Sequence, residues 1–429
     1  MKTKVSSRTV FIAIVAALGG ILFGYDTAVI SGTTEVVKMQ FGLTTGGEGW
    51  YVGCALIGSI LGVLIAGMMS DFLGRKKTML ISALLFSISA IGCAVSQDFT
   101  QLVIFRIVGG FGIGIVSIVS PVYISEVSPA EVRGTMVSLY QLFITIGFLL
   151  AYLANYLILK GTSMPDYWRP MLGAEAIPDI LFLVLIFFIP ESPRWLAVRG
   201  QREDKSEEWK ALREPGILKA VLIGSAIAIL GQFMGVNAVL YYGPKIFADA
   251  GFEDPLFSTV LVGVVNMLTT IIALAIIDKV GRKQLVWWGV GGMIFCLLMI
   301  ALYFLPSTSL PTWFMLTFFL LYVFCTAISI SAVVFVLLSE MYPNRVRGLA
   351  MSIAGFALWV GTYLIGQLTP WMLETLTPAG TFFLFAFMCL PYLWIMYKYV
   401  PNTTGKTLEE IEEYWSRFGG RGDKAQSIK

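Results

Sequence analysis

The sequence predicts an all-α membrane protein with twelve transmembrane helices, and three observations support this fold class. First, 57% of the 429 residues are hydrophobic and 13% are charged, whereas a soluble chain carries about 25% charged residues. Second, twelve apolar runs are long enough to cross a bilayer, since a membrane helix needs about 20 such residues. Third, several sequence blocks recur, which indicates two related halves. A water-soluble enzyme is excluded.

The composition also excludes several kinds of chemistry. The chain has no histidine, which is the usual proton shuttle and metal ligand. The five cysteines all lie in apolar runs and none forms a C-x-x-C pair, so we interpret them as packing residues. We therefore expect no enzyme activity, no metal and no cofactor. A net charge of +3 is too small to indicate binding to nucleic acid.

The expected spans follow one another along nearly the whole chain. The first run has no small-residue cleavage site behind it, so we expect a retained helix and not a signal peptide. The runs lie at 9–31, 50–70, 78–97, 100–122, 134–158, 171–189, 217–243, 256–277, 284–305, 312–338, 347–372 and 380–400.

Basic residues in the loops predict the orientation of the chain, because cytoplasmic loops carry an excess of Lys and Arg. An even number of spans puts both termini on one side, which we expect to be the cytoplasm. That side holds Arg75, Lys76, Lys77, Arg133, the basic residues between 194 and 219, Lys279, Arg282, Lys283, Arg345 and Arg347. The other side holds Lys38, Lys160, Arg169 and Lys245.

Three blocks recur at nearly one separation, which predicts two six-helix halves related by pseudo-twofold symmetry. Asp71 and Asp278 are 207 residues apart, Asp26 and Asn237 are 211 apart, and Glu126 and Glu340 are 214 apart. We expect halves at 1–193 and 217–400, a short cytoplasmic linker at 194–216 and a cytoplasmic tail at 401–429. Within the tail, 406–418 has apolar residues at helical spacing. Parallel halves with a site between them are a transporter architecture.

Two glycine patterns have a structural interpretation. The stretch 110–114 reads GFGIG and looks like a dinucleotide-binding fingerprint. It lies in an apolar run without the strand that such a fingerprint requires, so we predict close helix packing. Gly58 and Gly62 have the same interpretation.

Several motifs resemble the sugar porter family of the major facilitator superfamily over nearly the whole chain. They are GYDTAVISG at 24–32, the D-x-x-G-R-K blocks beginning at Asp71 and Asp278, PESPRWL at 190–196, GQFMGVNAVLYYGP at 231–244 and VPNTTGKTLEE at 400–410. Asp26 in the first motif is most similar to bacterial xylose/proton symporters. The resemblance implies the major facilitator fold and a multi-pass protein of the bacterial inner (plasma) membrane.

The sequence departs from the family pattern at five places. Gly231 stands where a first glutamine is expected, and Phe148 stands where some xylose carriers have glutamine. The tenth helix has SAVVF at 331–335, without the proline that breaks it in the family. The tail has Asn402 in place of glutamate, and the linker is about half the usual length. The first two departures leave the identity of the sugar open.

Ionisable residues inside the spans are candidates for proton coupling, because a charge at membrane depth is costly and needs a partner. We identified Asp26, Arg106 and Glu175 as such residues. Asp26 and Arg106 were placed roughly 8–9 Å below the outer surface from 1.5 Å per residue, which is consistent with a pair. Asp26 would release a proton with Arg106 near and hold it with Arg106 apart. The alternative is a permanent ion pair, and Glu175 either assists the proton or only bonds to a neighbour.

A neutral sugar needs amides for its hydroxyls and an aromatic face for its C–H groups, and an amide both donates and accepts. The resemblance implies sugar contacts at Gln141, Gln232, Asn237 and Trp359, with Phe23, Ile144, Tyr241 and Gly355 lining the pocket or gate. The alternatives are helix–helix hydrogen bonds for the amides and packing for Trp359.

Acids and bases also cluster at the predicted cytoplasmic helix ends. Pairs between facing ends would latch the inner gate while the outer gate is open, whereas topology alone explains the basic residues but not the acids. The candidate gate residues are Asp71, Arg75, Glu126, Arg133, Glu191, Arg194, Asp278, Arg282, Glu340 and Arg347.

These expectations describe a secondary transporter that imports a neutral monosaccharide with a proton by alternating access. The sugar is a pentose or hexose, with a xylose-like one favoured. A facilitative uniporter is the alternative, and a membrane sugar sensor is disfavoured by the short tail. We expect a monomer in the lipid bilayer without an obligatory protein partner.

Overall fold

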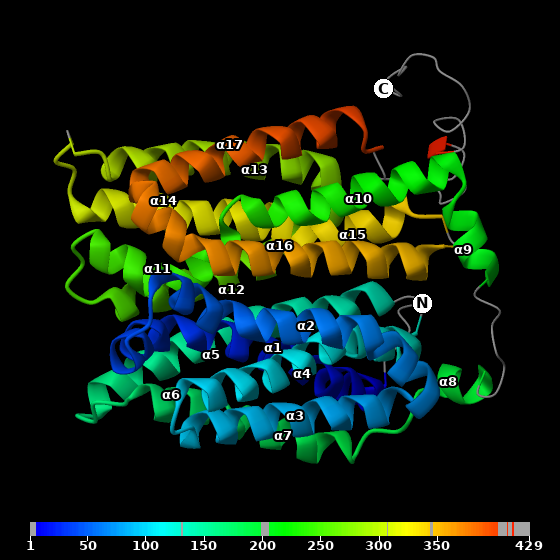
Figure 1. Cartoon of the computed structure of the whole chain (residues 1–429). Helices are drawn as coiled ribbons and strands as arrows, with labels where there is room; N and C mark the ends of the chain where they lie inside the picture. Colours follow the sequence, from blue (N-terminus) through cyan, green and yellow to red (C-terminus); the bar gives the residue numbers. More distant parts are fainter. Residues whose placement is uncertain are drawn as a thin grey trace.

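The computed structural model describes residues 6–129, 132–198, 206–306, 308–343, 346–401, 410 and 414–415. Within these residues the chain is helical and no strand is present. Figure 1 shows two helical bundles, one built from α1–α7 and the other from α10–α17. The start of α1, the end of α17 and the helices α8 and α9 lie at one end of the molecule (Figure 1).

The first bundle contains the first six predicted spans. Its helices are α1 (Ser7–Phe41), α2 (Thr45–Leu73), α3 (Arg75–Val95), α4 (Phe99–Val127), α5 (Arg133–Gly161), α6 (Trp168–Gly173) and α7 (Ala176–Ile186). The connecting segment between the bundles includes α8 (Pro193–Val198) and α9 (Ser206–Leu212).

The second bundle contains the remaining spans. Its helices are α10 (Pro215–Phe233), α11 (Val236–Asp249), α12 (Pro255–Val280), α13 (Arg282–Tyr303), α14 (Thr312–Thr326), the π-helical turn η1 (Ala327–Ser331), α15 (Ala332–Met341), α16 (Arg347–Thr375) and α17 (Thr377–Lys398). Between the bundles, α2 packs against α16 and α5 packs against α12.

Short polar side chains begin several of these helices. Thr44 accepts a hydrogen bond from the Gly47 N–H at 3.2 Å, and Asp98 accepts one from the Gln101 N–H at 2.9 Å. Such caps satisfy backbone donors that have no partner in the first turn. Gly42 ends α1 with φ +60°, and its N–H bonds to the Lys38 carbonyl. Residues close in sequence to these helix ends therefore determine where the helices begin and end.

Eleven helical segments in the described part of the chain are long and apolar enough to cross a membrane. The remaining predicted run, the sixth at 171–189, is split between α6 and α7. Pro178 has no N–H, so the Ala174 carbonyl is bonded by Ile177 N at 3.2 Å instead, which interrupts the helix. The tenth span is interrupted as well, by η1, although it contains no proline.

Glycines bring the helices of the first bundle together, as the sequence predicted. A Cβ added to Gly110 would lie 1.8 Å from the Ala55 carbonyl oxygen, and one added to Gly58 would lie 2.2 Å from the Ile107 oxygen. A Cβ on Gly24 of α1 would lie 2.1 Å from the Ile144 oxygen of α5. Small residues at such contacts allow membrane helices to approach backbone to backbone. The interpretation of 110–114 as helix packing is confirmed.

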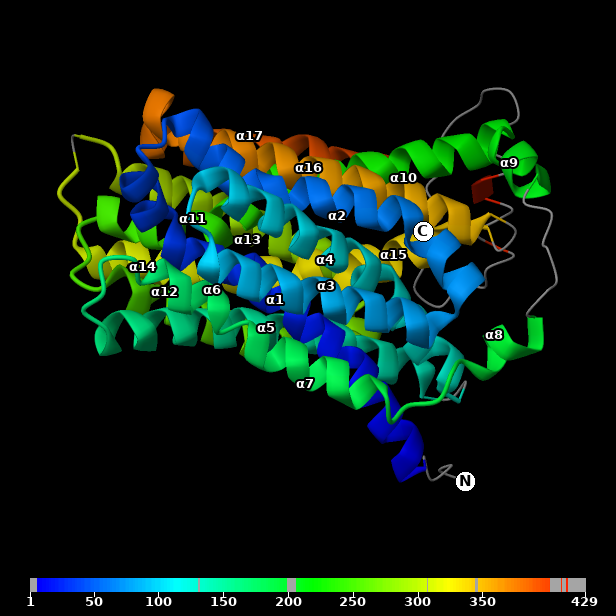
Figure 2. The ribbon, with the colours of Figure 1, turned by 60° about the horizontal axis from the view of Figure 1, so that its bottom comes forward.

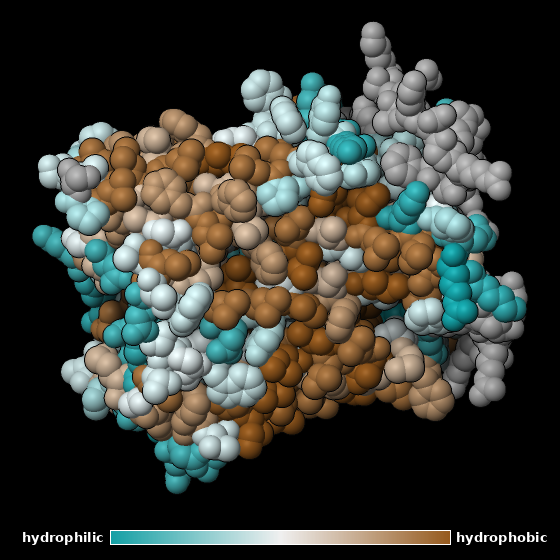
Figure 3. Space-filling model, turned by 45° about the horizontal axis from the view of Figure 1, so that its top comes forward, coloured by the Kyte–Doolittle hydropathy of each residue, from teal (hydrophilic) through white to brown (hydrophobic). Residues whose placement is uncertain are grey.

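The outer surface carries an apolar belt between two hydrophilic ends, and Figure 3 shows it as a brown band across the visible face. Large side chains such as Phe72 and Trp288 are exposed on the molecule. A surface of this kind fits a bilayer, where no water hydrates the hydrocarbon depth. Most of the predicted tail helix 406–418 lies outside the described residues; of it, Trp415 donates to the Met341 carbonyl at 2.9 Å.

Candidate functional site

A break between α10 and α11 presents two of the predicted sugar contacts. Gly235 adopts φ +90°, and a Cβ there would lie 2.4 Å from the Phe385 ring, so only glycine fits. Gln232 and Asn237 lie on either side of the break, and the Asn237 amide donates to Gln232 Oε1 at 2.5 Å. Thr362 of α16 donates to the same oxygen at 3.2 Å. Discontinuous helices of this kind form substrate sites in transporters.

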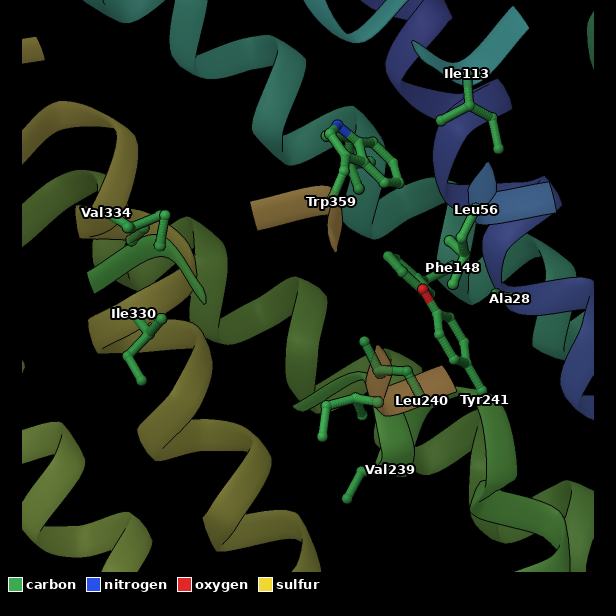
Figure 4. Close-up of a cluster of buried hydrophobic side chains, with 14 of the residues drawn as sticks. Ala28, Leu56, Ile113, Phe148, Val239, Leu240, Tyr241, Ile330, Val334 and Trp359 are labelled. Carbon is green, nitrogen blue, oxygen red and sulfur yellow. The ribbon is translucent and has the colours of Figure 1, made fainter. Parts of the chain in front are cut away.

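Aromatic side chains join the two bundles beside these amides. The ring of Phe23 in α1 lies 5.5 Å from that of Trp359 in α16, measured between centroids. Figure 4 shows Trp359, Phe148 and Tyr241 in one cluster, with the Tyr241 hydroxyl directed toward Phe148. Phe148 therefore occupies part of the interface with an apolar ring, where some relatives are expected to have an amide.

The other predicted sugar residues lie in the same layer but make fewer contacts. A Cβ added to Gly355 would meet no atom within 4 Å, so this position of α16 faces open space. Ile144 is buried where α5 packs against Gly24. Gln141 lies one turn earlier in α5 and is half-buried. No hydrogen bond connects it to Gln232 or Asn237 among the described residues. Of the four predicted polar and aromatic contacts, the structure therefore joins two, Gln232 and Asn237, by a direct bond.

Thr362 was not among the predicted site residues. It follows Trp359 by three positions, which puts both on one face of a helix. Since α16 was already assigned one sugar contact, this spacing was a usable signal for a hydroxyl at the site.

Asp26 and Arg106 form an ion pair in the middle of the first bundle. Arg106 Nη1 donates to Asp26 Oδ1, and the two side chains are 2% and 3% exposed. The same nitrogen lies 3.5 Å from the Asp26 carbonyl oxygen. Asp26 Oδ2 and Arg106 Nε have no hydrogen-bond partner. A buried pair with unused donors and acceptors is poised to change partners, because the remaining groups are costly to leave unpaired.

The predicted depth of Asp26 requires a correction. The expected first span ended at residue 31, but α1 continues to Phe41, so Asp26 lies 15 residues before its end. Arg106 lies seven residues after the start of α4 at Phe99. The two nevertheless meet, because α1 extends past the apolar run on which the estimate was based.

Glu175 lies at the break between α6 and α7 and is buried, with Oε1 unpartnered. Asp179 follows one turn later, is fully buried, and has both carboxyl oxygens unpartnered. Three ionisable residues were predicted inside the spans. This number was wrong, because Asp179 is a fourth. Asp179 lies within the run 171–189, so its position alone was a sufficient signal.

Most of the predicted gate residues of the first half meet at the end of α2, α3 and α4 that is predicted to be cytoplasmic. Arg75 donates from Nε and Nη2 to the two oxygens of Glu126, both at 3.1 Å, and from Nη1 to Asp71 at 3.2 Å. Glu191 accepts from the backbone N–H groups of Arg75 and Lys76 at 2.9 and 3.1 Å. A carboxylate at the start of α3 also complements the helix dipole. These contacts brace one half internally.

The second half has a corresponding pair. Arg282 Nη2 lies 3.0 Å from Glu340 Oε1, and Arg347 donates to the Tyr342 carbonyl at 3.2 Å. The side chains of Arg133 and Arg194 are exposed. The side chain of Asp278 lies outside the described part of the structure, so its predicted role stays a prediction.

Polar contacts between the halves are found at the opposite end, which is predicted to be the outer one. Glu48 is fully buried in the first turn of α2 and bonds to two lysines: Lys38 of α1 at 2.7 Å and Lys245 of α11 at 2.9 Å. Thr45 donates to Glu374, and Gln367 donates to the Gly46 carbonyl at 3.2 Å. Lys160 pairs with Asp254 at 2.9 Å on the surface. This end is therefore closed by polar contacts of α2 and α5 with the second half.

These features define a class of protein. Two helical bundles enclose a layer of amides and aromatic rings at membrane depth, closed toward one side and next to a buried ion pair. Among the residues that the structure describes, no group of His, Cys, Asp or Glu is arranged to hold a metal ion. The molecule is a multi-pass membrane transporter, with its site between the halves.

Comparison with known proteins identifies the family. The family model described as "Sugar (and other) transporter" matches residues 12–216 and 205–415. The chain belongs to this family, whose members are transporters and not enzymes.

Individual relatives are similar over nearly their whole length. The chain is 37% identical to the arabinose-proton symporter of Bacillus subtilis, with 95% of each chain covered. It is 36% identical to the D-xylose-proton symporter of Escherichia coli, with 97% of each chain covered. A structure described as the inward open conformation of the E. coli xylose transporter matches with a TM-score of 0.82 at 36% identity, covering 94% of this chain and 99% of that one.

Proposed function

We propose that this protein imports a neutral monosaccharide together with a proton, with a xylose-like pentose favoured over a hexose. The observation that carries the proposal is the buried Asp26–Arg106 pair. Phe23, which contacts Trp359, lies one turn before Asp26 on the same helix. A change in the charge of Asp26 can therefore be felt at the sugar layer through α1. The names of the symporter relatives support the same conclusion.

The sugar is held between the two bundles. Gln232, Asn237 and Thr362 supply a connected set of donors and acceptors from α10, α11 and α16. Gln141 offers a further amide from α5, and Trp359 offers a ring face for the C–H groups of the sugar. Each amide contributes in both directions, so hydroxyls of either orientation are accommodated.

Proton coupling follows from the one guanidinium in the core of the first bundle. With Asp26 ionised, Arg106 is paired and the two charges balance. A proton on Asp26 removes that partner, and Arg106 turns toward Glu175, whose Oε1 is unpartnered. This exchange ties the protonation of Asp26 to the position of α1 against α4. The two halves then rock about the sugar, exposing it to each side in turn.

The coupling ion is the proton, and no other cofactor is required. We place the protein in the bacterial inner membrane with both termini in the cytoplasm, because basic loop residues gather on that side. It acts as a monomer without an obligatory protein partner. The alternative function is a uniporter, in which Asp26–Arg106 only holds α1 to α4.

Uptake of labelled xylose, arabinose and glucose into proteoliposomes, with and without a pH gradient, tests the proposal. The unaltered protein is expected to concentrate the preferred sugar only with the gradient. Asp26→Asn keeps the size and polarity of the side chain but cannot ionise near neutral pH. It should lose uphill accumulation and keep sugar binding. Accumulation by Asp26→Asn would show that Asp26 does not carry the proton.

Exchange of labelled for unlabelled sugar without a gradient provides the control, since it needs the site and the conformational change but no coupling. Asp98→Asn, at the exposed start of α4, makes the same chemical change away from the pair and should transport as the unaltered protein does.

A further inference from the structure

Asp179 is a buried acid that the proposed mechanism does not use. Its side chain is fully buried in α7, and neither carboxyl oxygen has a hydrogen-bond partner. The hydroxyl of Tyr25 on α1 is likewise buried without a partner and interacts electrostatically with both Glu175 and Asp179. α7 packs against α1 and α3, and Figure 2 shows it alongside them. The first bundle thus contains a set of polar atoms with unused hydrogen-bonding capacity beside the coupling pair.

The charges around Asp179 do not balance if every acid is ionised. Residues 9–37, 78–127 and 170–190 contain a single basic side chain, Arg106. Three carboxyl groups share it, since Asp26 and Asp179 interact electrostatically and Glu175 interacts with both. Asp179 interacts electrostatically with Tyr25 and Asp26 on α1 and with Glu175. Glu175 in turn interacts with Cys93 on α3 and Arg106 on α4.

One carboxylate satisfies Arg106, and in this structure it is that of Asp26. An unpaired carboxylate in a dry interior is costly, whereas the neutral acid is tolerated. Glu175 and Asp179 therefore hold protons while the bundle is sealed from water. A proton held at the coupling site, and released where water reaches the acid, is what a symporter transports.

We propose that Asp179 is a second proton-binding residue of the coupling site, so that more than one proton enters with each sugar. The inference rests on the proposed symport and adds to it a proton number. Asp179 takes its proton from outside water as the carboxylate becomes the acid. It returns the proton to inside water in the conformation that hydrates α7. No other bond changes and no further reactant is needed.

The proton number is measured by the sugar gradient at which net flux is zero, with the membrane potential clamped at zero. One proton per sugar balances about a tenfold sugar gradient per pH unit, and two protons balance about a hundredfold gradient, since one pH unit is tenfold in proton activity. We expect the unaltered protein to balance more than a tenfold sugar gradient per pH unit. Asp179→Asn should balance only a tenfold gradient. Asp179→Glu, which retains an acid, should restore the steeper dependence on pH.

The outcomes separate the two proposals. A tenfold gradient per pH unit in the unaltered protein overturns the second proton and leaves symport intact. The second proton is also overturned if Asp179→Asn balances the same gradient, steeper than tenfold per pH unit, as the unaltered protein does. In that case Asp179 would keep its proton permanently. Absence of any uphill accumulation in the unaltered protein rejects symport and this inference together. Exchange of sugar without a gradient verifies that Asp179→Asn is folded, and the measurement on the unaltered protein stands even where that variant does not fold.

Discussion

The two ends of the molecule use the same kinds of charged side chain in different ways. At the outer end, Glu48 of the first half bonds to Lys245 of the second. At the cytoplasmic end, Arg75 bonds to Glu126 within the first half, and Arg282 bonds to Glu340 within the second. Outer ion pairs therefore connect the halves, whereas these cytoplasmic pairs stiffen each half by itself.

The difference indicates which contacts change during transport. A half that moves as a rigid body needs its helix ends tied together, and the Arg75–Glu126 pair with its Ser192 contact at 2.5 Å does this. Contacts between halves must break and re-form in every cycle. The outer set contains one fully buried carboxylate, Glu48, whose two lysines are partly exposed. When the outer end opens, water can hydrate the Glu48 carboxylate and so compensate for the loss of its ion pairs.

The sugar layer lies between the two ends. The variant with the largest expected effect on sugar affinity, Gln232→Ala, tests whether binding in this layer is independent of the contacts at the ends. Gln232→Ala removes an amide oxygen that accepts from Asn237 and Thr362 and that we propose to contact the sugar. Loss of a hydrogen-bonding partner in a desolvated site costs about 1–3 kcal/mol, or roughly 5- to 150-fold in affinity. Calorimetry with the preferred sugar measures this. An unchanged affinity would place the sugar elsewhere, and Gln97→Ala, at an exposed position between α3 and α4, serves as the matched control.

Much of the fold was predictable from local properties of the sequence. Apolar runs, basic loops and the recurrence of Asp71 and Glu126 specify spans and order, because each depends on a few neighbouring residues. The Asp26–Arg106 pair was predictable as well, since a buried charge needs a partner. Asp179 lies in a predicted span as well, so its burial could have been predicted in the same way.

Other features depend on contacts between distant segments. Gly235 was part of a recognised motif, yet the Phe385 ring from another helix leaves no room for a Cβ at this position. The Glu48–Lys245 pair joins residues 197 positions apart, and no repeat or motif connected them. The same holds for the direction of the cytoplasmic pairs, because sequence shows that acids and bases share an end but not whether they pair within a half or between halves.

Glu48→Gln tests the outer contact between the halves. Two lysines lose their buried partner, and the closed outer end loses its main ion pairs. With about 1.4 kcal/mol for a tenfold change, we expect a shift of about tenfold toward the outward-open form. The measurement is labelling of Gly355→Cys, in a background without native cysteines, by an impermeant reagent applied from either side of the membrane.

Glu35→Gln provides the control for this variant, because Glu35 lies near the same end on α1 but is exposed. It should leave the labelling ratio unchanged. Equal behaviour of the two variants would mean that Glu48 does not hold the halves together.

Glu126→Gln combined with Glu340→Gln tests the cytoplasmic pairs. Arg282–Glu340 is partly exposed, whereas Arg75–Glu126 is nearly buried. Both pairs lie within one half and leave the contacts between the halves in place, so the labelling ratio should shift less than about fivefold. Transport should slow, since α3 and α4 lose a connection at their ends. A shift toward the inward-open form as large as that of Glu48→Gln would support the predicted role of these pairs as a latch of the inner gate.

A smaller effect on sugar affinity than that of Gln232→Ala is expected at Gly231, the departure from the family that adjoins the sugar layer. A Cβ at this position would lie 3.7 Å from Ile330 and from the Tyr392 ring, which is ordinary contact. The Tyr392 hydroxyl is buried without a partner. The first carbon of a side chain is therefore accommodated, and the amide of Gly231→Gln is expected to bond to that hydroxyl or to the sugar. One added hydrogen bond stabilises by about 0.5–1.5 kcal/mol, so sugar affinity should rise roughly two- to tenfold.

Gly231→Ala separates this effect from helix stabilisation, because alanine removes the flexibility of glycine without adding an amide. We expect alanine to leave the affinity unchanged by calorimetry and glutamine to raise it, with the labelling of both ends unaltered in each. Equal affinities for the two variants would show that the amide finds no partner there. A changed labelling ratio would show that the sugar layer and the ends are coupled through α10. Sugar binding in the middle of the molecule would then not be separable from the contacts at the two ends that determine its conformation.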